Sequence, residues 1–329
     1  MKKNILIVGS GSIGKRHAKN FSYLGCEISI FDLREDRLKE VGRGVNVKAS
    51  YNDLNDAIKN DKYDGAIICS PTLYHPEQAS LFIGMGIPVL MEKPLAINLS
   101  DGLKLKSSID KFNGKLLLGY TWRWWEPLRI VKKMLKENTV GNLRYVQFNM
   151  SAHLADWHPW ERYQDFFMSS KKLGGGALLD ESHWLDIMIW LFGMPTSING
   201  TVGKISNLEI ETDDNVDLIC VYERMNVGIH LDLYGRPHEK SIRFIGEDGS
   251  ILWSADPNRI SLCKQSSPTW EEQNFEYQRN DMFVGAANDF IQVMNGQLQP
   301  SCTVDDGINV MKTIEAARES SLSGKTIVL

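Results

Sequence analysis

The apolar positions of the first 120 residues form short runs separated by amphipathic segments. Four or five apolar residues that stop at a turn signal predict a buried strand, and apolar residues three and four apart predict a helix. Strands that alternate with helices through short links predict a parallel sheet covered on both faces. We expect strands at 5–8, 27–31, 65–69, 88–91 and 115–119, and helices at 12–24, 34–41, 53–59 (capped by Asp53), 75–85 and 100–111 (capped by Ser100).

The pattern changes near residue 121. Alternating apolar and polar positions prevail from 196 to about 278, and Asp248-Gly249 is a hairpin turn signal. We predict an α/β chain with a first domain over 1–121 and a second over 122–329, of α+β type with a large, mostly antiparallel open sheet. Further helices are expected at 126–136, about 176–192, 282–294 and about 304–320, the last as a candidate to pack back on the first domain.

The turn after the first strand has the pattern G-x-G-x-x-G, formed by Gly9, Gly11 and Gly14. The first glycine permits a tight turn, the second leaves room for a pyrophosphate, and the third lets helix and strand pack closely. Ser12 and Ile13 open the helix, whose N-terminus favours phosphate. The pattern predicts a dinucleotide site, and the alternative is a glycine turn in an α/β domain that binds no nucleotide.

Asp32 follows the second strand at the distance typical of an acidic residue that binds an adenosine ribose. Its charge would repel a 2′-phosphate, so we expect NAD as the cofactor. Arg34 and Arg37 lie just beyond and could offset that charge, which keeps NADP possible. Ligands of parallel sheets bind at the carboxyl ends of the strands, which here carry Gly9, Asp32, Ser70, Glu92 and Tyr120.

Composition narrows the function classes. The chain has 329 residues, with 37 Lys and Arg against 41 Asp and Glu, so its formal net charge is −4. This balance gives no broad basic surface for nucleic acid or anionic lipid. The five cysteines form no C-x-x-C pair, and the apolar runs are too short to span a bilayer. We expect a soluble cytoplasmic protein that binds neither nucleic acid nor membrane.

Two polar segments are candidates for catalysis. Lys93, in Glu92-Lys93-Pro94, follows a buried strand, where the proline stiffens the exit and a lysine beside nicotinamide can hydrogen-bond a substrate hydroxyl. By itself the motif favours a surface lysine at the start of a loop. Asp180, His183 and Asp186 follow three glycines at intervals of three, so they would share a helix face, and a carboxylate can fix the tautomer of a nearby imidazole. By itself that spacing favours a polar pair on a helix surface.

A metal site is a further alternative, because His153, Asp156 and His158 are close in the sequence. The chain has neither H-x-x-x-H nor a cysteine ligand there, so we expect no metal.

The substrate prediction rests on aromatic and basic residues after the first domain. Aromatic faces pack against the C–H face of a pyranose while polar groups bind its hydroxyls, and arginine binds carboxylate or diphosphate. At least half of the tryptophans are expected in the core, Trp124 or Trp125 among them. The candidate substrate contacts are Lys93, Tyr120, Arg123, Trp157, Tyr163, Asp180, His183 and Arg236.

Together the motifs resemble the glucose-fructose oxidoreductase / inositol dehydrogenase (Gfo/Idh/MocA) family. The resemblance rests on residues 9–17, on Cys69-Ser70-Pro71-Thr72 with His75, on Glu92-Lys93-Pro94 and on residues 174–186. It implies a Rossmann domain followed by an α/β domain whose open sheet often supports oligomerisation. It also implies that Lys93, Asp180 and His183 flank the substrate, although many members have four steps, not three, between aspartate and histidine. The implied cofactor contacts are Gly9, Gly11, Ser12, Ile13, Gly14, Asp32, Arg37, Cys69, Ser70, Pro71, Thr72, His75, Glu92 and Lys93.

We therefore expect an NAD(P)-dependent oxidoreductase acting on a secondary alcohol of a sugar, cyclitol or nucleotide-sugar derivative. His183 would take the hydroxyl proton, Lys93 would polarise the oxygen and Asp180 would orient the imidazole, although Lys93 and His183 could exchange roles. We expect a homodimer or homotetramer formed through the second sheet. Two alternatives stay open, a non-catalytic dinucleotide sensor and NAD-assisted glycoside cleavage.

Overall fold

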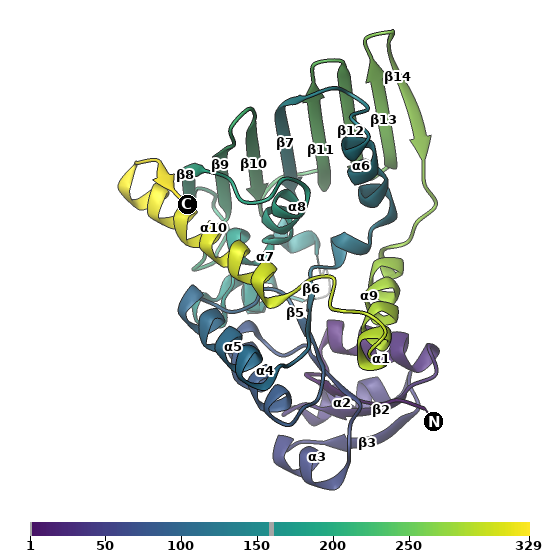
Figure 1. Cartoon of the computed structure of the whole chain (residues 1–329). Helices are drawn as coiled ribbons and strands as arrows, with labels where there is room; N and C mark the ends of the chain where they lie inside the picture. The colour runs from purple at the N-terminus through teal and green to yellow at the C-terminus, as the bar shows by residue number, and fades with distance from the viewer. Residues whose placement is uncertain (1, 158–160) are drawn as a thin grey trace. The chain divides into compact units, whose positions relative to one another are not determined.

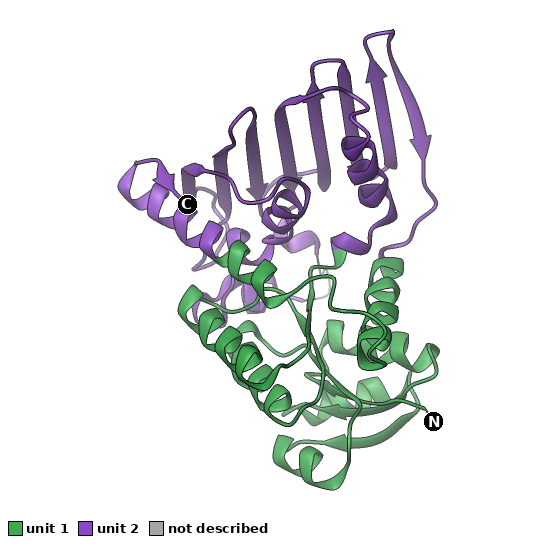
Figure 2. Cartoon of the chain, viewed as in Figure 1, with its two compact units in different colours: residues 1–121, 280–311 green, residues 122–279, 312–329 purple. Residues whose placement is uncertain are grey.

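The structure is a computed structural model that describes residues 2–157 and 161–329. The chain folds into two compact units, shown in different colours in Figure 2. The first unit comprises residues 1–121 and 280–311, and the second comprises 122–279 and 312–329. The first unit thus takes in the segment 280–311, which follows the second sheet in the sequence.

A six-stranded parallel sheet forms the centre of the first unit, in the order β3-β2-β1-β4-β5-β6 (Figure 1). The predicted parallel sheet is confirmed. The strands are β1 (Asn4–Val8), β2 (Glu27–Phe31), β3 (Val47–Tyr51), β4 (Gly65–Ile68), β5 (Val89–Glu92) and β6 (Leu116–Gly119). The helices are α1 (Ser12–Tyr23), α2 (Glu35–Gly42), α3 (Leu54–Asn60), α4 (His75–Gly84), α5 (Leu99–Phe112) and α9 (Arg279–Met294), with α10 (Val304–Ser323) divided between the units.

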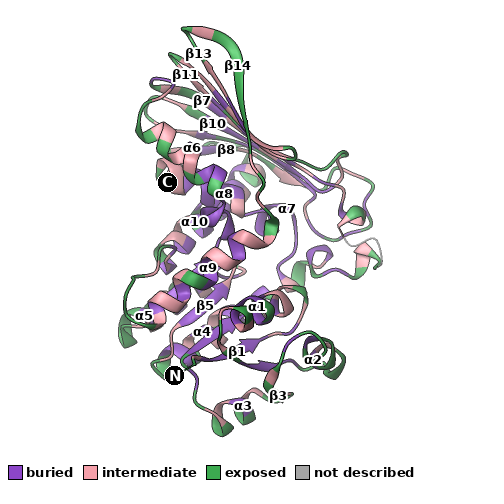
Figure 3. Cartoon of the chain, turned by 90° about the vertical axis from the view of Figure 1, so that its right-hand side faces the viewer, coloured by how far each residue is buried: buried purple, intermediate pink, exposed green. Residues whose placement is uncertain are grey.

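The register of this sheet aligns the carboxyl ends of its central strands. Val8 pairs with Phe31 on one side and with Ile68 on the other. Ile68 pairs with Met91, so Cys69 and Glu92 follow at the same edge. β1 is buried along its whole length, as its purple colour in Figure 3 indicates. The residues that follow these strands therefore share one edge, as the sequence predicts.

Two helix starts and one strand deserve comparison with the sequence. Asp53 caps α3 as predicted, because its carboxylate accepts from the N–H groups of Asn55 and Asp56. Ser100 was the wrong cap for α5, since the side chain of Asn98 accepts from the Asp101 N–H and the helix starts at Leu99. β3 was missed, because its residues are only half-buried at the sheet edge and carry no apolar run.

The second unit contains a nine-stranded sheet in the order β14-β13-β12-β11-β7-β10-β9-β8-β15. Only β7 and β10 pair in parallel, so the predicted mostly antiparallel sheet is confirmed. The strands are β7 (Leu143–Ser151), β8 (Ser197–Gly203), β9 (Asn215–Val221), β10 (Asn226–Asp232), β11 (Glu239–Gly246), β12 (Gly249–Ala255), β13 (Asn258–Lys264), β14 (Ser267–Asn274) and β15 (Ile327–Val328). The longer helices of this unit are α6 (Glu126–Lys136) and α8 (His183–Phe192).

The core of the second unit lies between one face of this sheet and the helices α6 and α8 (Figure 1). Trp184 of α8 is fully buried and its ring centroid lies 6.3 Å from that of Phe148 on β7 and 6.3 Å from that of Trp253 on β12. Trp124 and Trp125 are also buried, so these two tryptophans are core residues as predicted.

The helix predicted over about 176–192 is in fact two helices, α7 (Ala177–Asp180) and α8. Glu181 and Ser182 form a turn between them. The turn is held by the Trp184 indole, which donates to a Glu181 carboxylate oxygen at 3.0 Å, and by the Asp186 N–H, which donates to the Ser182 carbonyl at 3.0 Å. Asp180 therefore ends one helix and His183 begins the next, which corrects the prediction that they share a face of one continuous helix.

Candidate functional site

The glycine turn after β1 has the shape that a dinucleotide requires. Gly9 has φ +93°, and a Cβ on it would lie 2.7 Å from the Ser70 nitrogen. A Cβ on Gly14 would lie 1.9 Å from the Gly9 carbonyl oxygen. Helix α1 and the turn after β1 are therefore too close at this point for any side chain. A Cβ on Gly11 would meet only the Arg37 guanidinium, at 3.9 Å. The space beside Gly11 is therefore open, as a pyrophosphate needs.

The N-terminus of α1 faces this turn with its first backbone N–H groups. Its N-cap is Gly11, which offers no side-chain hydrogen bond, and Ser12 and Ile13 are the first helical residues. An α-helix leaves its first N–H groups without helical acceptors, and the helix dipole favours negative charge there. The observed cradle fits the diphosphate of NAD.

Asp32 is held rigidly at the end of β2. One carboxylate oxygen accepts from the Ser10 N–H at 2.7 Å and the other accepts from the Arg34 N–H at 2.9 Å. The Arg37 guanidinium lies 3.8 Å from the same oxygen that Ser10 binds. Asp32 is only 7% exposed, whereas the Arg37 side chain is 41% exposed. The carboxylate is thus fixed in place, and the neighbouring cation is the mobile partner.

His75 connects the two loops that follow β4 and β5. Its Nδ1 lies 3.0 Å from the Pro94 carbonyl oxygen and its Nε2 lies 2.8 Å from the Ser70 carbonyl oxygen. Burial lowers the pKa of His75, against the two carbonyls and Glu92, which favour the charged ring. Thr72 is buried in the same loop, and burial raises the pKa of the Cys69 thiol. Through the two contacts of His75, the loop after β4, which carries expected cofactor residues, is connected to the loop after β5 at the same edge of the sheet.

Lys93 follows directly on a second anchored residue, Glu92. The Glu92 carboxylate lies 2.8 Å from Nε2 of His17, a buried residue of α1 that packs against Phe21 and Phe283. His17 is thus a supporting residue that our site prediction missed, although it closes the motif of residues 9–17 in the resemblance. Lys93 itself is partly buried.

In the second unit, two of the predicted carboxylates have different environments. Asp186 is fully buried and accepts both the ε and an η N–H of Arg123, at 2.9 and 2.7 Å. Arg123 is itself only 7% exposed. Asp180 is also buried, and His183 is partly exposed. Asp186 and Arg123 therefore form an internal ion pair, and the predicted pairing of Asp180 with His183 stays a prediction.

The other predicted substrate contacts have different environments. Tyr120 is fully buried after β6. The Arg236 guanidinium binds the Asp156 carboxylate through two hydrogen bonds, of 2.7 and 2.9 Å, on the surface. The hydroxyl of Tyr163 accepts from the Glu209 N–H at 3.3 Å, and Trp157 is partly exposed. Their role as substrate contacts stays a prediction.

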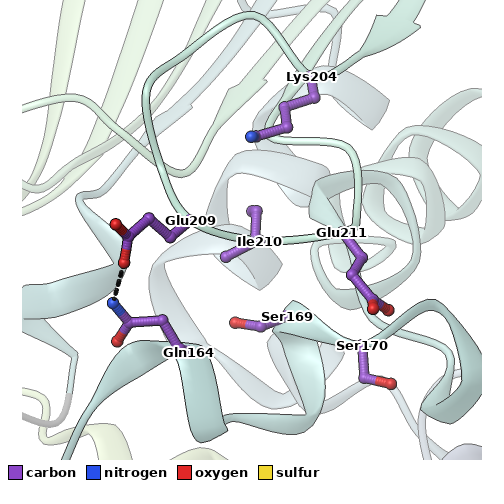
Figure 4. A pocket seen from close by; sticks show the side chains of 7 residues that line it. All are labelled: Gln164, Ser169, Ser170, Lys204, Glu209, Ile210 and Glu211. Atoms are coloured by element: carbon purple, nitrogen blue, oxygen red, sulfur yellow. Dashed lines mark hydrogen bonds between the residues drawn. The ribbon is translucent and has the colours of Figure 1, made fainter.

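A surface pocket lies beside Tyr163 in the second unit (Figure 4). The Gln164 amide donates to a Glu209 carboxylate oxygen at 2.8 Å across it. Its lining is polar and charged, and it contains none of the residues predicted for the site. The lining residues are Gln164, Ser169, Ser170, Lys204, Glu209, Ile210 and Glu211.

Neither a metal cluster nor a membrane span is found in the described parts of the chain. Among residues 2–157 and 161–329, no three His, Cys, Asp or Glu side chains are placed to hold a metal ion. His158 of the proposed metal alternative lies outside the described residues. Over the same ranges, no helix is both long and apolar enough to cross a bilayer.

Two polar residues of the second unit were missed by sequence reasoning. Lys240 on β11 and His238 just before it interact through a contact of 2.6 Å between the lysine nitrogen and Nε2. Burial lowers the pKa of Lys240, and the carboxylates of Glu181 and Asp180 oppose that shift. Glu181 and Asp180 are distant from Lys240 in the sequence, so no local pattern reveals this interaction.

Comparison with known proteins gives two family matches. Residues 3–120 match the model of the oxidoreductase family with an NAD-binding Rossmann fold, and residues 128–252 match the model of the GFO/IDH/MocA C-terminal domain.

Individual relatives extend over most of the chain. Myo-inositol 2-dehydrogenase of Thermotoga maritima is 30% identical over 98% of this chain and 97% of its own length. Glucose-6-phosphate 3-dehydrogenase of Bacillus subtilis is 24% identical over 72% of this chain and 65% of its own length. Among solved structures, levoglucosan dehydrogenase in complex with NADH has a TM-score of 0.90 at 16% identity, covering 100% of this chain and 99% of that one.

Proposed function

The chain belongs to the GFO/IDH/MocA family of oxidoreductases, and from this premise we propose that it moves a hydride between a nicotinamide and a secondary alcohol of a sugar, cyclitol or sugar derivative. Its membership confirms the resemblance found in the motifs. The observation that carries the proposal is the position of Lys93, directly after β5 at the strand-end edge that also carries the glycine turn and Asp32.

Three side chains have roles in the proposed reaction. Nicotinamide, when bound, accepts the carbinol hydrogen with its two electrons. Lys93 donates a hydrogen bond to the alcohol oxygen, and His183 accepts the hydroxyl proton as the carbonyl forms. Asp180 orients the imidazole of His183 and stabilises its charged form. Electrons and protons balance, because one hydride and one proton leave the alcohol.

The preferred cofactor in this proposal is NAD. Support comes from Asp32, whose carboxylate is fixed by two backbone N–H groups and carries a charge that repels a 2′-phosphate. Arg37 is the residue that would weaken this preference, since its exposed guanidinium could turn toward a phosphate. Dissociation constants for NADH and NADPH decide the point, and tighter NADPH binding would refute the preference.

The proposed substrate class follows the relatives. The names of two relatives specify a cyclitol, myo-inositol, and a sugar phosphate, glucose 6-phosphate. We therefore include inositols, sugars, sugar phosphates and nucleotide sugars among the candidate substrates. Trp157, Tyr163 and Arg236 are the proposed residues for the part of the substrate that does not react.

The proposed assembly is a homodimer or homotetramer formed through the nine-stranded sheet, and the proposed location is the cytoplasm. Along β7, Tyr145, Gln147, Asn149 and Ser151 alternate with buried residues and point away from α6 and α8, and Ile219 on β9 is 43% exposed on that same side. This side of the sheet, which is only partly buried in the single chain, supports pairing with a second copy. Free thiols at all five cysteines support a reducing compartment.

The experiment that tests the proposed function is NADH fluorescence on the purified protein with NAD and a panel of candidate substrates. NADH that appears with one class of alcohol establishes a dehydrogenase and names its substrate class. Tight NADH binding without turnover across the panel would contradict the proposal and favour a sensor. Release of an aglycone without net NADH would favour NAD-assisted glycoside cleavage.

A further inference from the structure

Lys93 lies in the chain between two residues that buried histidines hold. On one side, the Glu92 carboxylate lies 2.8 Å from Nε2 of His17. On the other side, the Pro94 carbonyl oxygen lies 3.0 Å from Nδ1 of His75. His17 belongs to α1 and His75 is the first residue of α4. Both neighbours of the lysine are therefore tied to helices of the first unit.

The Glu92 carboxylate is enclosed within the first unit. Its side chain is 12% exposed and that of His17 is 1% exposed. Gly119 pairs with Glu92 in the sheet, and a Cβ on it would lie 3.2 Å from the Glu92 Cα and 3.3 Å from its Cδ, so a side chain there would crowd Glu92. Whereas the Asp32 carboxylate accepts from backbone N–H groups, Glu92 is held by a side chain.

The imidazole of His17 is itself fixed by aromatic packing. Its ring centroid lies 6.2 Å from that of Phe21 on the same helix and 5.7 Å from that of Phe283 on α9. A carboxylate only accepts hydrogen bonds, so Nε2 donates in the contact with Glu92, and Nδ1 has no hydrogen-bond partner among the described residues. A phenylalanine would fill this space without burying a polar ring. The hydrogen bond to Glu92 is therefore what the histidine adds.

We propose that His17 is a positioning residue for Lys93, because its hydrogen bond to Glu92 fixes the residue before the lysine against α1, while His75 fixes the residue after it. The inference rests on the proposed function, in which Lys93 polarises the alcohol. α1 is also the helix whose N-terminus forms the cradle for the diphosphate. One helix thus holds both the cofactor and the lysine, and catalytic groups act fully only within about 0.5 Å of their productive positions.

The first test needs no substrate and measures how firmly Lys93 is held. Trace acetylation of the resting protein, followed by mass spectrometry of its peptides, gives the reactivity of Lys93 relative to the exposed Lys62. In His17→Leu this ratio should rise by about threefold or more, because the loop opens locally. His17→Gln, whose amide can donate to Glu92, should restore it. Glu92→Ala removes the same hydrogen bond from the other side and should act as His17→Leu does, which covers a leucine variant that fails to fold.

The second test compares kcat with stability. In His17→Leu, kcat for the best substrate of the panel should fall by about 10- to 100-fold, while NADH affinity holds because the N–H groups of α1 are unchanged. His17→Gln should recover most of this loss. Phe290→Leu is the matched control, at a fully buried residue of α9 whose ring centroid lies 6.2 Å from that of Phe21. It should lower the unfolding temperature and keep kcat near the wild-type value.

The outcomes separate the inference from the proposed function. Wild-type acetylation of Lys93 in a folded His17→Leu overturns the inference even when the wild type is an active dehydrogenase. A loss of kcat that Phe290→Leu matches at an equal loss of stability, or that a folded His17→Gln does not recover, also overturns it. A wild type that binds NADH without turning over any substrate overturns the proposed function, while the acetylation ratio still decides whether His17 holds Lys93.

Discussion

The cofactor-binding edge of the first unit and the Asp180–His183 region of the second are built in different ways. At the cofactor edge, functional residues follow buried parallel strands and are fixed by backbone groups, as Asp32 is by two N–H donors and His75 by two carbonyls. In the second region, side chains interact with other side chains, as Lys240 does with His238 and Arg123 with Asp186. The first arrangement depends on a local motif, and the second depends on the complete fold.

This difference has a consequence for what a substitution does. At the cofactor edge, a change of side chain leaves the backbone cradle in place and alters binding. In the second region, removal of one partner leaves a buried polar or charged group without its match, so stability and catalysis are both at risk. Four predictions test this comparison, in order of decreasing effect.

The largest effect is expected for Lys93→Met. Loss of the polarising ammonium should lower kcat by about 10³-fold, since one acid–base group typically contributes 10²–10⁴-fold. NADH affinity should change less than about twofold, because the cradle at α1 is untouched. Lys62→Met, at an exposed lysine of the same unit, is the control, and steady-state kinetics with fluorescence titration provide both numbers. Wild-type turnover in Lys93→Met would remove this residue from the mechanism.

The next effect is on stability, and it separates the two carboxylates of the second region. Asp186→Asn removes the negative charge that the buried Arg123 guanidinium binds through two hydrogen bonds and should lower the free energy of unfolding by about 3–5 kcal/mol. Asp180→Asn should instead lower kcat by about 10²-fold with a smaller change in stability. Chemical denaturation and kinetics of both variants measure the contrast. If Asp186→Asn were as stable as the wild type, the ion pair would not be structural.

Two glycines sharpen the same comparison within the cofactor edge. Gly11→Ala has space for its methyl group in the protein, so stability should hold while NADH binding weakens by about tenfold or more. Gly14→Ala would bring a methyl group to 1.9 Å from the Gly9 carbonyl oxygen and should cost roughly 2–4 kcal/mol of stability. Thermal unfolding and NADH titration of the pair distinguish the two roles. Equal behaviour of the two variants would contradict the assigned geometry.

The smallest effect is a pH dependence on the sheet of the second unit. Hydrogen bonds to Asp232 and Asp217 raise the pKa of His230 to about 9, against the effect of burial. Because the folded pKa lies above the unfolded one, this stabilisation is complete below about pH 6.5 and is lost as the pH rises through 9. The unfolding temperature should therefore fall less in His230→Gln than in the wild type between pH 7 and pH 10. If the unfolding temperatures of the two proteins fell in parallel with pH, His230 would contribute no pH-dependent stabilisation.

Much of the first unit could be predicted from the sequence, because its signals are local. The run Ile5 to Gly14 contains strand, turn and helix start within ten residues, and each element has its own physical requirement. Asp32 follows the next strand, and the single helix between the two strands sets its distance from the glycine turn in the sequence. The wrong cap of α5 was also a local error, because Asn98 and Ser100 are both polar residues that can cap a helix and only Leu99 lies between them.

The second region resisted prediction because its contacts are distant in the sequence. Arg123 could be identified as a possible anion binder, yet its actual partner Asp186 lies 63 residues away and is reached only when α8 packs. Lys240 carried no signal at all, since its environment depends on which face of β11 it occupies. The break between α7 and α8 is held by contacts such as that of the Trp184 indole with the Glu181 carboxylate, which no periodicity encodes.

The most direct test of the central claim follows the hydrogen atom itself. The substrate identified by the panel is prepared with deuterium at the carbinol carbon that is oxidised, and the NADH formed by the wild type is analysed by mass spectrometry and NMR. The account predicts that each NADH carries one deuterium on its nicotinamide ring and that Lys93→Met forms it far more slowly. NADH without deuterium, or product formed with no NADH at any time, would contradict direct hydride transfer.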